Sequence, residues 1–137
     1  MGSEKHSFTQ AKLAHLLANL NKFNVYNELS IEINGNEYKP DVCIYQKSKK
    51  KTLKDIIRMT EMPLLAIEIL SPSQGFQELA DKVEIYFNAG IKSNWIVLPS
   101  QESVIVCSSL EEFETFSKGN VIDNIIGIEL PINEIFE

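Results

Sequence analysis

Leu64-Leu65-Ala66-Ile67-Glu68-Ile69-Leu70, followed by Ser71-Pro72-Ser73, is the stretch of sequence that decides the fold. The run 64–70 is apolar at every position but one, which is typical of a central strand covered on both faces of a sheet. A second apolar run, Trp95-Ile96-Val97-Leu98, follows residues 76–87, where apolar side chains recur at helical spacing. The order strand, helix, strand predicts a parallel βαβ unit and therefore an α/β core.

Upstream of this unit, the pattern predicts a helix followed by a pair of strands. Leucines recur at helical spacing between residues 13 and 20, and Thr9 is a suitable N-cap for that helix. Residues 23–33 and 38–45 then have the character of strands on either side of the turn Asn34-Gly35-Asn36, which predicts a hairpin. Apolar side chains three and four residues apart predict a further short helix over residues 51–59.

Downstream of residue 98 the pattern is more antiparallel. Residues 104–107, 113–116 and 125–130 are expected to pair in succession, and Pro131 is suited to start a terminal helical turn. No repeat or linker divides the 137 residues, and a chain of that length buries about two-thirds of the surface that it exposes when unfolded. We therefore expect one domain over residues 1–137, of which residues 1–8 are mobile.

Composition excludes several classes of protein. The chain is 44% hydrophobic and 23% charged, which is close to the average for a globular domain and excludes collagen-like and disordered classes. No apolar run approaches the roughly 18 residues of a membrane span, and residues 1–6 lack a secretory apolar segment, so we expect a cytoplasmic protein without membrane association. Cys43 and Cys107 lie in apolar runs and are expected to be buried, reduced thiols.

The charge is unevenly distributed along the chain. The net charge is −6, but residues 47–58 hold six of the thirteen basic residues and a single acid, so the remainder is strongly acidic. This basic strip is either a surface that faces phosphate groups or a solvated loop and helix face, and charge alone leaves both interpretations open.

Few of the usual catalytic residue types are present. The chain has two histidines, His6 in the expected mobile terminus and His15 in the first helix, where a packing role is the simpler interpretation. Catalysis by a serine or cysteine nucleophile needs a base beside it, and the sequence offers no good candidate. A glycine-rich phosphate loop, paired cysteine ligands and a dinucleotide fingerprint are also missing, which excludes the enzyme classes built on those motifs.

Three charged residues remain as candidates for chemistry. Glu68 is a carboxylate in a strand buried on both faces, which requires a metal, a cation or several hydrogen bonds; a frayed strand end or a core lysine are the structural explanations. Asp41 follows Pro40 at a bend that could redirect its side chain, or else it is an ordinary turn aspartate. Lys82 lies four residues after Glu78, which is the spacing of a surface ion pair on a helix.

A series of motifs stands in a set order over about residues 10–136. They are Tyr38-Lys39-Pro40-Asp41-Val42, the run from Leu65 to Ser73, Asp81-Lys82 with Tyr86, Ala89-Gly90-Ile91, Trp95-Ile96-Val97 with Pro99, and Gly127-Ile128-Glu129-Leu130-Pro131 with Ile135-Phe136. This series resembles the Uma-type family of bacterial restriction endonuclease-like proteins, which belongs to the PD-(D/E)XK nuclease superfamily. The resemblance implies a restriction endonuclease-like fold of α/β class, with a central mixed β-sheet flanked by helices.

The resemblance also implies the residues of a site. Asp41 and Glu68 match motif carboxylates that bind Mg²⁺ or Mn²⁺, and Glu28 matches an acidic position that is a further candidate ligand. Lys82 matches a lysine that the family carries on the helix, because the superfamily's usual lysine position, two residues after the glutamate, is Leu70 here. In such a site the metal activates water and neutralises charge on the phosphate, while the lysine orients the nucleophile or stabilises the transition state.

The implied activity is metal-dependent hydrolysis of phosphodiester bonds in nucleic acid. DNA is the expected substrate, and Lys49, Lys50, Lys51 and Lys54 are candidate contacts to its backbone. A homodimer would suit a nuclease that cuts both strands, although no residue pattern in the sequence indicates one.

Two alternatives to an active nuclease stay open. The segment Gln74-Gly75-Phe76-Gln77-Glu78 lacks the basic residues that the family carries at this point, which favours a catalytically silent member that binds nucleic acid or a protein. The acidic composition also allows a plain interaction module, in which Glu68 and Lys82 form a buried ion pair.

Overall fold

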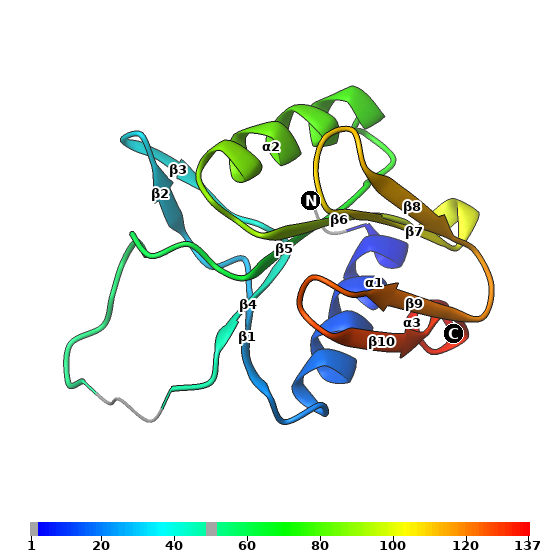
Figure 1. Cartoon of the computed structure of the whole chain (residues 1–137), viewed down its shortest axis with the longest axis horizontal. Helices are drawn as coiled ribbons and strands as arrows, with labels where there is room; N and C mark the ends of the chain where they lie inside the picture. Colours follow the sequence, from blue (N-terminus) through cyan, green and yellow to red (C-terminus); the bar gives the residue numbers. More distant parts are fainter. Residues whose placement is uncertain (1–2, 49–51) are drawn as a thin grey trace.

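Six strands form one twisted sheet in the order β1-β4-β5-β6-β7-β8 in a computed structural model that describes residues 3–48 and 52–137 (Figure 1). The strands of this sheet are β1 (Phe23–Asn27), β4 (Val42–Gln46), β5 (Leu65–Ile69), β6 (Ser93–Leu98), β7 (Ser103–Cys107) and β8 (Phe113–Phe116). Two small hairpins accompany it, β2 (Ile31–Ile33) with β3 (Asn36–Tyr38) and β9 (Asn120–Asp123) with β10 (Ile128–Pro131). The helices are α1 (Glu4–Ala18), α2 (Phe76–Asn88) and α3 (Ile132–Phe136), with a 3₁₀ turn, η1 (Pro99–Gln101), after β6.

The centre of the sheet is the predicted βαβ unit. Strands β5 and β6 pair in parallel, helix α2 connects them, and every other neighbouring pair in the sheet is antiparallel. All five residues of β5 are buried, as its apolar run, interrupted only by Glu68, predicts. Gly90 ends the helical segment at a φ of +100°, a conformation that glycine adopts without strain. The prediction of a mixed α/β sheet flanked by helices is confirmed.

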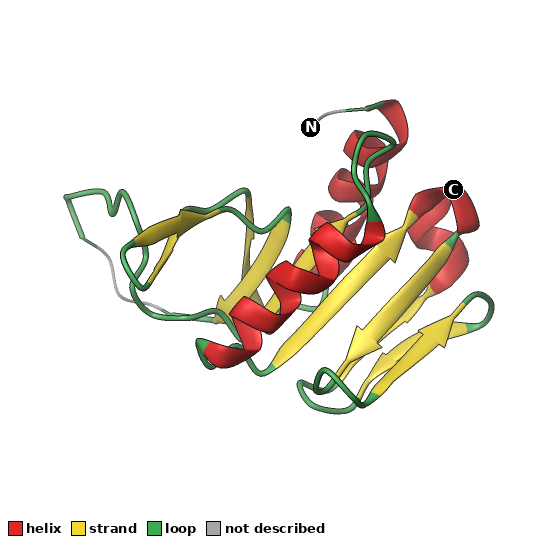
Figure 2. Cartoon of the chain, turned by 90° about the horizontal axis from the view of Figure 1, so that it is seen from above, coloured by secondary structure: helices red, strands yellow, loops and turns green. Residues whose placement is uncertain are grey.

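The two faces of the sheet are covered by different elements (Figures 1 and 2). One face packs Trp95 and Val97 against Leu13 and Leu17 of α1, together with residues of α3 and of the β9–β10 hairpin. The opposite face is covered by α2, whose buried residues are Leu79, Val83 and Tyr86. Alternate residues of β5 therefore meet either α1 or α2, and Glu68 lies on the α2 side.

The first helix begins earlier than its apolar pattern predicts. Its N-cap is Ser3, whose hydroxyl accepts a hydrogen bond from the backbone of His6, whereas Thr9 lies buried inside the helix. The buried positions of α1 are His6, Thr9, Leu13 and Leu17, so the buried face continues toward the N-terminus through polar residues. Residues 4–8, which belong to the segment expected to be mobile, form the first turns of α1.

The helix expected over residues 51–59 does not form in its described part, residues 52–59. Leu53 is fully exposed and Ile57 nearly so, which means that a short helix here would have no surface against which to bury its apolar face. The hydroxyl of Thr52 and the carboxylate of Asp55 instead accept hydrogen bonds from nearby backbone amides, at 3.3 and 2.8 Å, which competes with helix formation.

The C-terminal strands pair differently from the expected succession. Strand β8 pairs with β7 as predicted, but the last strand pairs with β9, over residues that were not expected to form a strand. Asp123 closes the turn between β9 and β10, because its carboxylate accepts hydrogen bonds from the amides of Ile125 and Ile126. Cys43 and Cys107 are free and buried, as predicted. No helix in the described ranges is long and apolar enough to cross a membrane.

Candidate functional site

Glu68 is the buried charge at the centre of the site. Its residue is 3% exposed, and its carboxylate lies between strand β5 and helix α2. Tyr86 donates a hydrogen bond of 2.7 Å to Oε2, while Nζ of Lys82 lies 3.6 Å from Oε1. Lys82 and Tyr86 are four residues apart on α2, so one face of the helix supplies both partners. The sequence candidates Glu68 and Lys82 therefore meet.

Asp41 reaches the same end of β5 from the neighbouring strand. It directly precedes β4, whose first residue, Val42, pairs with Ile67 in the antiparallel register. Oδ2 of Asp41 accepts a hydrogen bond of 2.7 Å from the backbone amide of Ile69, the residue after Glu68. The two carboxylates thus converge where β4 begins and β5 ends, which is the edge of an α/β sheet where ligands commonly bind.

The protonation of Glu68 reflects this crowded environment. Burial, first of all, and the negative charge of Asp41 together raise its pKa from 4.5 to about 7, although the positive charge of Lys82 and the hydrogen bond from Tyr86 act in the opposite direction. A carboxyl group whose pKa is raised by burial and by a neighbouring carboxylate is typical of functional sites.

Tyr86 also contacts the β2–β3 hairpin. Its ring packs edge-on against Tyr38 of β3, with ring centroids 6.0 Å apart. The β2–β3 hairpin therefore supports the side chain that hydrogen-bonds Glu68, and the nearby buried residues Ile31 and Ile33 fill the space between this hairpin and α2.

Glu28 lies beside the site without joining the two carboxylates. Its side chain accepts a hydrogen bond of 3.2 Å from Gln10, and its backbone amide donates to the backbone oxygen of Asp41. Across residues 3–48 and 52–137, no group of three or more His, Cys, Asp or Glu side chains is arranged to hold a metal ion. The described geometry thus brings together two carboxylates, those of Asp41 and Glu68, with one lysine.

Comparison with known proteins places the chain in a family. A family model described as "putative restriction endonuclease", Uma2, matches residues 1–133. The chain belongs to the Uma2 family. The resemblance seen in the sequence motifs is confirmed by this match. No curated protein matches the chain.

The fold has a counterpart among solved structures. The crystal structure of a "putative nuclease belonging to DUF820" from Anabaena variabilis ATCC 29413 superposes with a TM-score of 0.82 at 20% identity. The match covers 99% of this chain and 82% of that chain. At this identity the similarity establishes the fold alone.

Of the candidate phosphate contacts, Lys54 is the one that the structure describes, and it lies apart from the two carboxylates. Lys54 is exposed on the connection between β4 and β5, which leaves β4 at Gln46, the end opposite to Asp41. Lys49, Lys50 and Lys51 belong to the same connection but fall outside the described residues. In Figure 1 the described part of this connection, residues 52–64, extends away from the sheet before it returns to β5.

The loop after β5 is closed by its own side chains. Gln74 accepts hydrogen bonds from the amide and the hydroxyl of Ser71, at 3.2 and 3.0 Å, and donates to Glu78 at 2.9 Å. The loop over residues 70–75 therefore has no charged side chain and is tied to the first turn of α2 through Glu78.

Two residues of α1 join the site that the sequence analysis did not place there. Nε2 of His6 lies 3.2 Å from Oδ1 of Asp41, and Gln10 donates to the backbone oxygen of Asp41 at 2.8 Å. Helical spacing could have indicated that His6 faces the core, because His6 and Thr9 continue the spacing of Leu13 and Leu17 toward the N-terminus. The search for apolar residues at helical spacing missed these two positions because both residues are polar.

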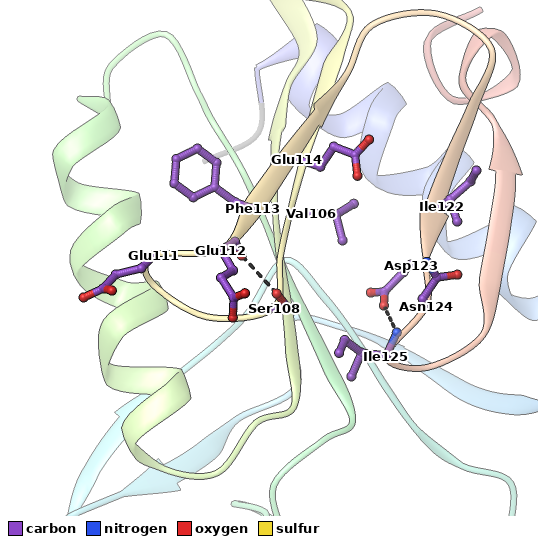
Figure 3. Close-up of a pocket in the computed structure, with 10 residues that line it drawn as sticks. All are labelled: Val106, Ser108, Glu111, Glu112, Phe113, Glu114, Ile122, Asp123, Asn124 and Ile125. Atoms are coloured by element: carbon purple, nitrogen blue, oxygen red, sulfur yellow. Dashed lines mark hydrogen bonds between the residues drawn. The ribbon is translucent and has the colours of Figure 1, made fainter.

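A pocket at the other end of the molecule is not part of this site. It has a volume of about 390 Å³ and lies between the β7–β8 connection and the β9–β10 turn (Figure 3). Glu111, Glu112 and Glu114 are among its lining residues, whereas Asp41, Glu68 and Lys82 are not. Three exposed carboxylates make it unsuited to a phosphate-bearing ligand.

Proposed function

We propose that this Uma2 chain is a metal-dependent endonuclease that hydrolyses phosphodiester bonds of nucleic acid. The observation that carries the proposal is the convergence of Asp41, Glu68 and Lys82 at one end of β5. Membership in a family described as "putative restriction endonuclease" and the fold of the Anabaena nuclease-like protein support the same reaction class.

The donor atoms at this point suit a small, hard divalent cation. Asp41 and Glu68 supply carboxylate oxygens, and Mg²⁺ is commonly bound through one or two carboxylates while it keeps several waters. The mutual repulsion that raises the pKa of Glu68 would be relieved by a positive charge between the two groups. Asp41 and Glu68 are therefore the residues that would hold Mg²⁺ or Mn²⁺, with Glu28 as a candidate at the margin.

The residues of the chain have separable roles in such a site. A bound divalent cation supplies Lewis-acid chemistry, in which it activates water and neutralises charge on the phosphate. Tyr86 orients Glu68 through its hydrogen bond, so that Oε1 stays directed toward Lys82. The Lys82 side chain is 34% exposed, and its ammonium group is thus accessible to a phosphate oxygen or to the attacking water.

The substrate side of the proposal is a nucleic acid, with DNA as the expected form. Lys54 and the neighbouring Lys49, Lys50 and Lys51 are proposed to contact the backbone away from the cleavage point, since their connection leaves β4 at the end opposite to Asp41. A homodimer would allow two such sites to act on the two strands of a duplex, and we include it in the proposal.

A catalytically silent binding module is the second candidate function. It is favoured by the loop after β5, where Gln74 and Glu78 bond to one another instead of presenting positive charge to a phosphate. In that case Lys82 would serve only as the counter-charge of Glu68.

Calorimetric titration with Mn²⁺ separates the two functions. We expect the wild-type chain to bind Mn²⁺, and we expect Asp41→Ala and Glu68→Ala to lose that binding. Glu84→Ala is the matched control, because Glu84 is an exposed carboxylate on α2. Absence of binding to the folded wild type at millimolar Mn²⁺ would remove the nuclease proposal and favour the binding module.

Cleavage assays then test the role of the lysine. Plasmid and single-stranded DNA are incubated with Mn²⁺ and with wild type, Asp41→Ala or Lys82→Ala. We expect both variants to lose cleavage, but only Asp41→Ala to lose metal binding. The ammonium group of Lys82 has no lone pair and therefore cannot be a metal ligand. An active Asp41→Ala variant would contradict the assignment.

A further inference from the structure

His6 has an unusual position for a residue so close to the start of the described chain. It lies in the first turns of α1, its residue is 3% exposed, and Nε2 lies 3.2 Å from Oδ1 of Asp41. The other buried residues of α1 are Thr9 and two leucines. An imidazole at this position makes fewer apolar contacts than a leucine would, and its buried nitrogens need hydrogen-bond partners. Its polar contact with Asp41 is the interaction that offsets this cost.

The carboxylate of Asp41 is fixed by two donors from different elements. His6 of α1 contacts Oδ1, and the backbone amide of Ile69 in β5 donates to Oδ2. One donor on each oxygen determines the orientation of the carboxylate plane, whereas a single donor would leave it free to rotate. The side chain is 15% exposed, so room remains at the carboxylate for a further ligand.

Helix α1 holds the same residue a second time through Gln10. This side chain lies one turn after His6 and donates to the backbone oxygen of Asp41 at 2.8 Å and to Glu28 at 3.2 Å. The helix therefore contacts both the backbone oxygen and the carboxylate of residue 41, in the short segment between β3 and β4, where the amide of Glu28 also donates to that backbone oxygen.

We propose that His6 is a positioning residue that orients the Asp41 carboxylate for a divalent cation shared with Glu68. The inference rests on the proposed function, which assigns no role to His6. Ligating carboxylates are commonly oriented by hydrogen bonds from neighbouring groups, and loss of such a partner typically weakens metal binding. The contact requires a proton on Nε2, and Nδ1 has no hydrogen-bond partner among the described residues.

The geometry favours positioning over direct ligation by His6. A histidine that binds a metal through Nε2 must present a lone pair there, whereas Nε2 faces an acceptor oxygen of Asp41. The two roles differ in what can replace the imidazole. A donor is replaced by an amide N–H in the same place, but a nitrogen ligand is not.

Three substitutions at one position test this difference. The amide nitrogen of Gln reaches about as far as Nε2, so His6→Gln keeps a donor for Asp41, whereas the shorter His6→Asn keeps polarity without that reach. His6→Leu removes the donor and fills the space. Mn²⁺ affinity is measured calorimetrically for each, with urea unfolding to verify the fold, and His15→Leu, at an exposed site of the same helix, is the control.

We expect Mn²⁺ affinity to fall about 10- to 100-fold in His6→Asn and His6→Leu. We expect His6→Gln to recover most of the affinity and His15→Leu to bind as the wild type does. If His6→Leu fails to fold, the contrast between Asn and Gln still decides the matter.

Each other outcome overturns the inference in a recognisable way. Wild-type affinity in all three variants would show that the orientation of Asp41 does not depend on His6, and would leave the proposed nuclease intact. Equal loss in Gln, Asn and Leu would assign His6 to the ligands or to packing. Absence of Mn²⁺ binding in the wild type itself would remove the proposed function and, with it, the role of His6.

Discussion

Glu68→Gln is predicted to stabilise the fold, but only at neutral and alkaline pH. Burial and the charge of Asp41 raise the pKa of Glu68 from 4.5 to about 7. A carboxyl group with a higher pKa in the folded chain binds more protons there than in the unfolded chain, so its ionisation reduces stability as the pH rises from 4.5 through 7. The cost is about 3 kcal/mol, a large share of the roughly 5–15 kcal/mol that stabilises a typical domain.

Glutamine removes the charge and keeps most of the contacts. Its amide oxygen can still accept the hydrogen bond from Tyr86. Lys82 loses its partner, but its ammonium group is solvated enough for this loss to be small. We therefore expect variant and wild type to differ little at pH 4, where Glu68 is protonated, and the variant to be more stable by about 2 kcal/mol at pH 8.5.

Urea unfolding in EDTA at pH 4, 6 and 8.5 measures this difference. Glu84→Gln is the control, because it removes one exposed negative charge from the same helix without any buried contact. A stability difference between Glu68→Gln and wild type that does not change with pH would refute the reasoning. A variant that is less stable at pH 8.5 would instead mean that Glu68 and Lys82 form a structural ion pair.

Four other substitutions have distinct expected effects. Tyr86→Phe removes the donor to Glu68 and is expected to reduce the free energy of unfolding by about 1–3 kcal/mol at pH 8.5, as measured by urea denaturation. Lys82→Met removes a charge that lowers the pKa of Glu68, so carboxyl NMR should show Glu68 titrating above pH 7. Asp123→Ala leaves the buried donors of Ser93 and Trp95 unpaired; thermal and urea unfolding should show a loss of about 3 kcal/mol, while calorimetry should show unchanged Mn²⁺ affinity. Leu53→Ser alters a fully exposed side chain and should change stability by less than about 0.5 kcal/mol in the same unfolding assay.

The central part of the fold was predictable because its signals are local. A run that is apolar on both faces, an amphipathic helix and a second apolar run determine β5, α2 and β6 within 34 residues. The turn at Asn34 and Gly35 was equally readable, because both residues adopt positive φ, at +50° and +82°. The carboxylate in β5 was conspicuous for the same reason, since it interrupts an otherwise continuous apolar pattern.

The parts that were not predicted depend on contacts distant in the sequence. His6 is buried because it meets Asp41, 35 positions away, and nothing near His6 in the sequence indicates that partner. The helix expected at residues 51–59 has suitable spacing but no surface to pack against. Strand β9 forms because it pairs with β10, whereas its own four residues carry a weak strand signal.

The environment of Leu70 gives a physical reason why the proposed site would take its lysine from α2 and not from the position two residues after Glu68. Leu70 occupies that later position and packs beside Leu79, Val83 and Ile96, an apolar cluster between α2 and the sheet. A lysine there would have to extend its charge through this cluster, at a cost in desolvation. Lys82 reaches Glu68 from the helix with its ammonium group still partly in water. A positive charge therefore lies beside Glu68, while Leu70 stays in the apolar cluster.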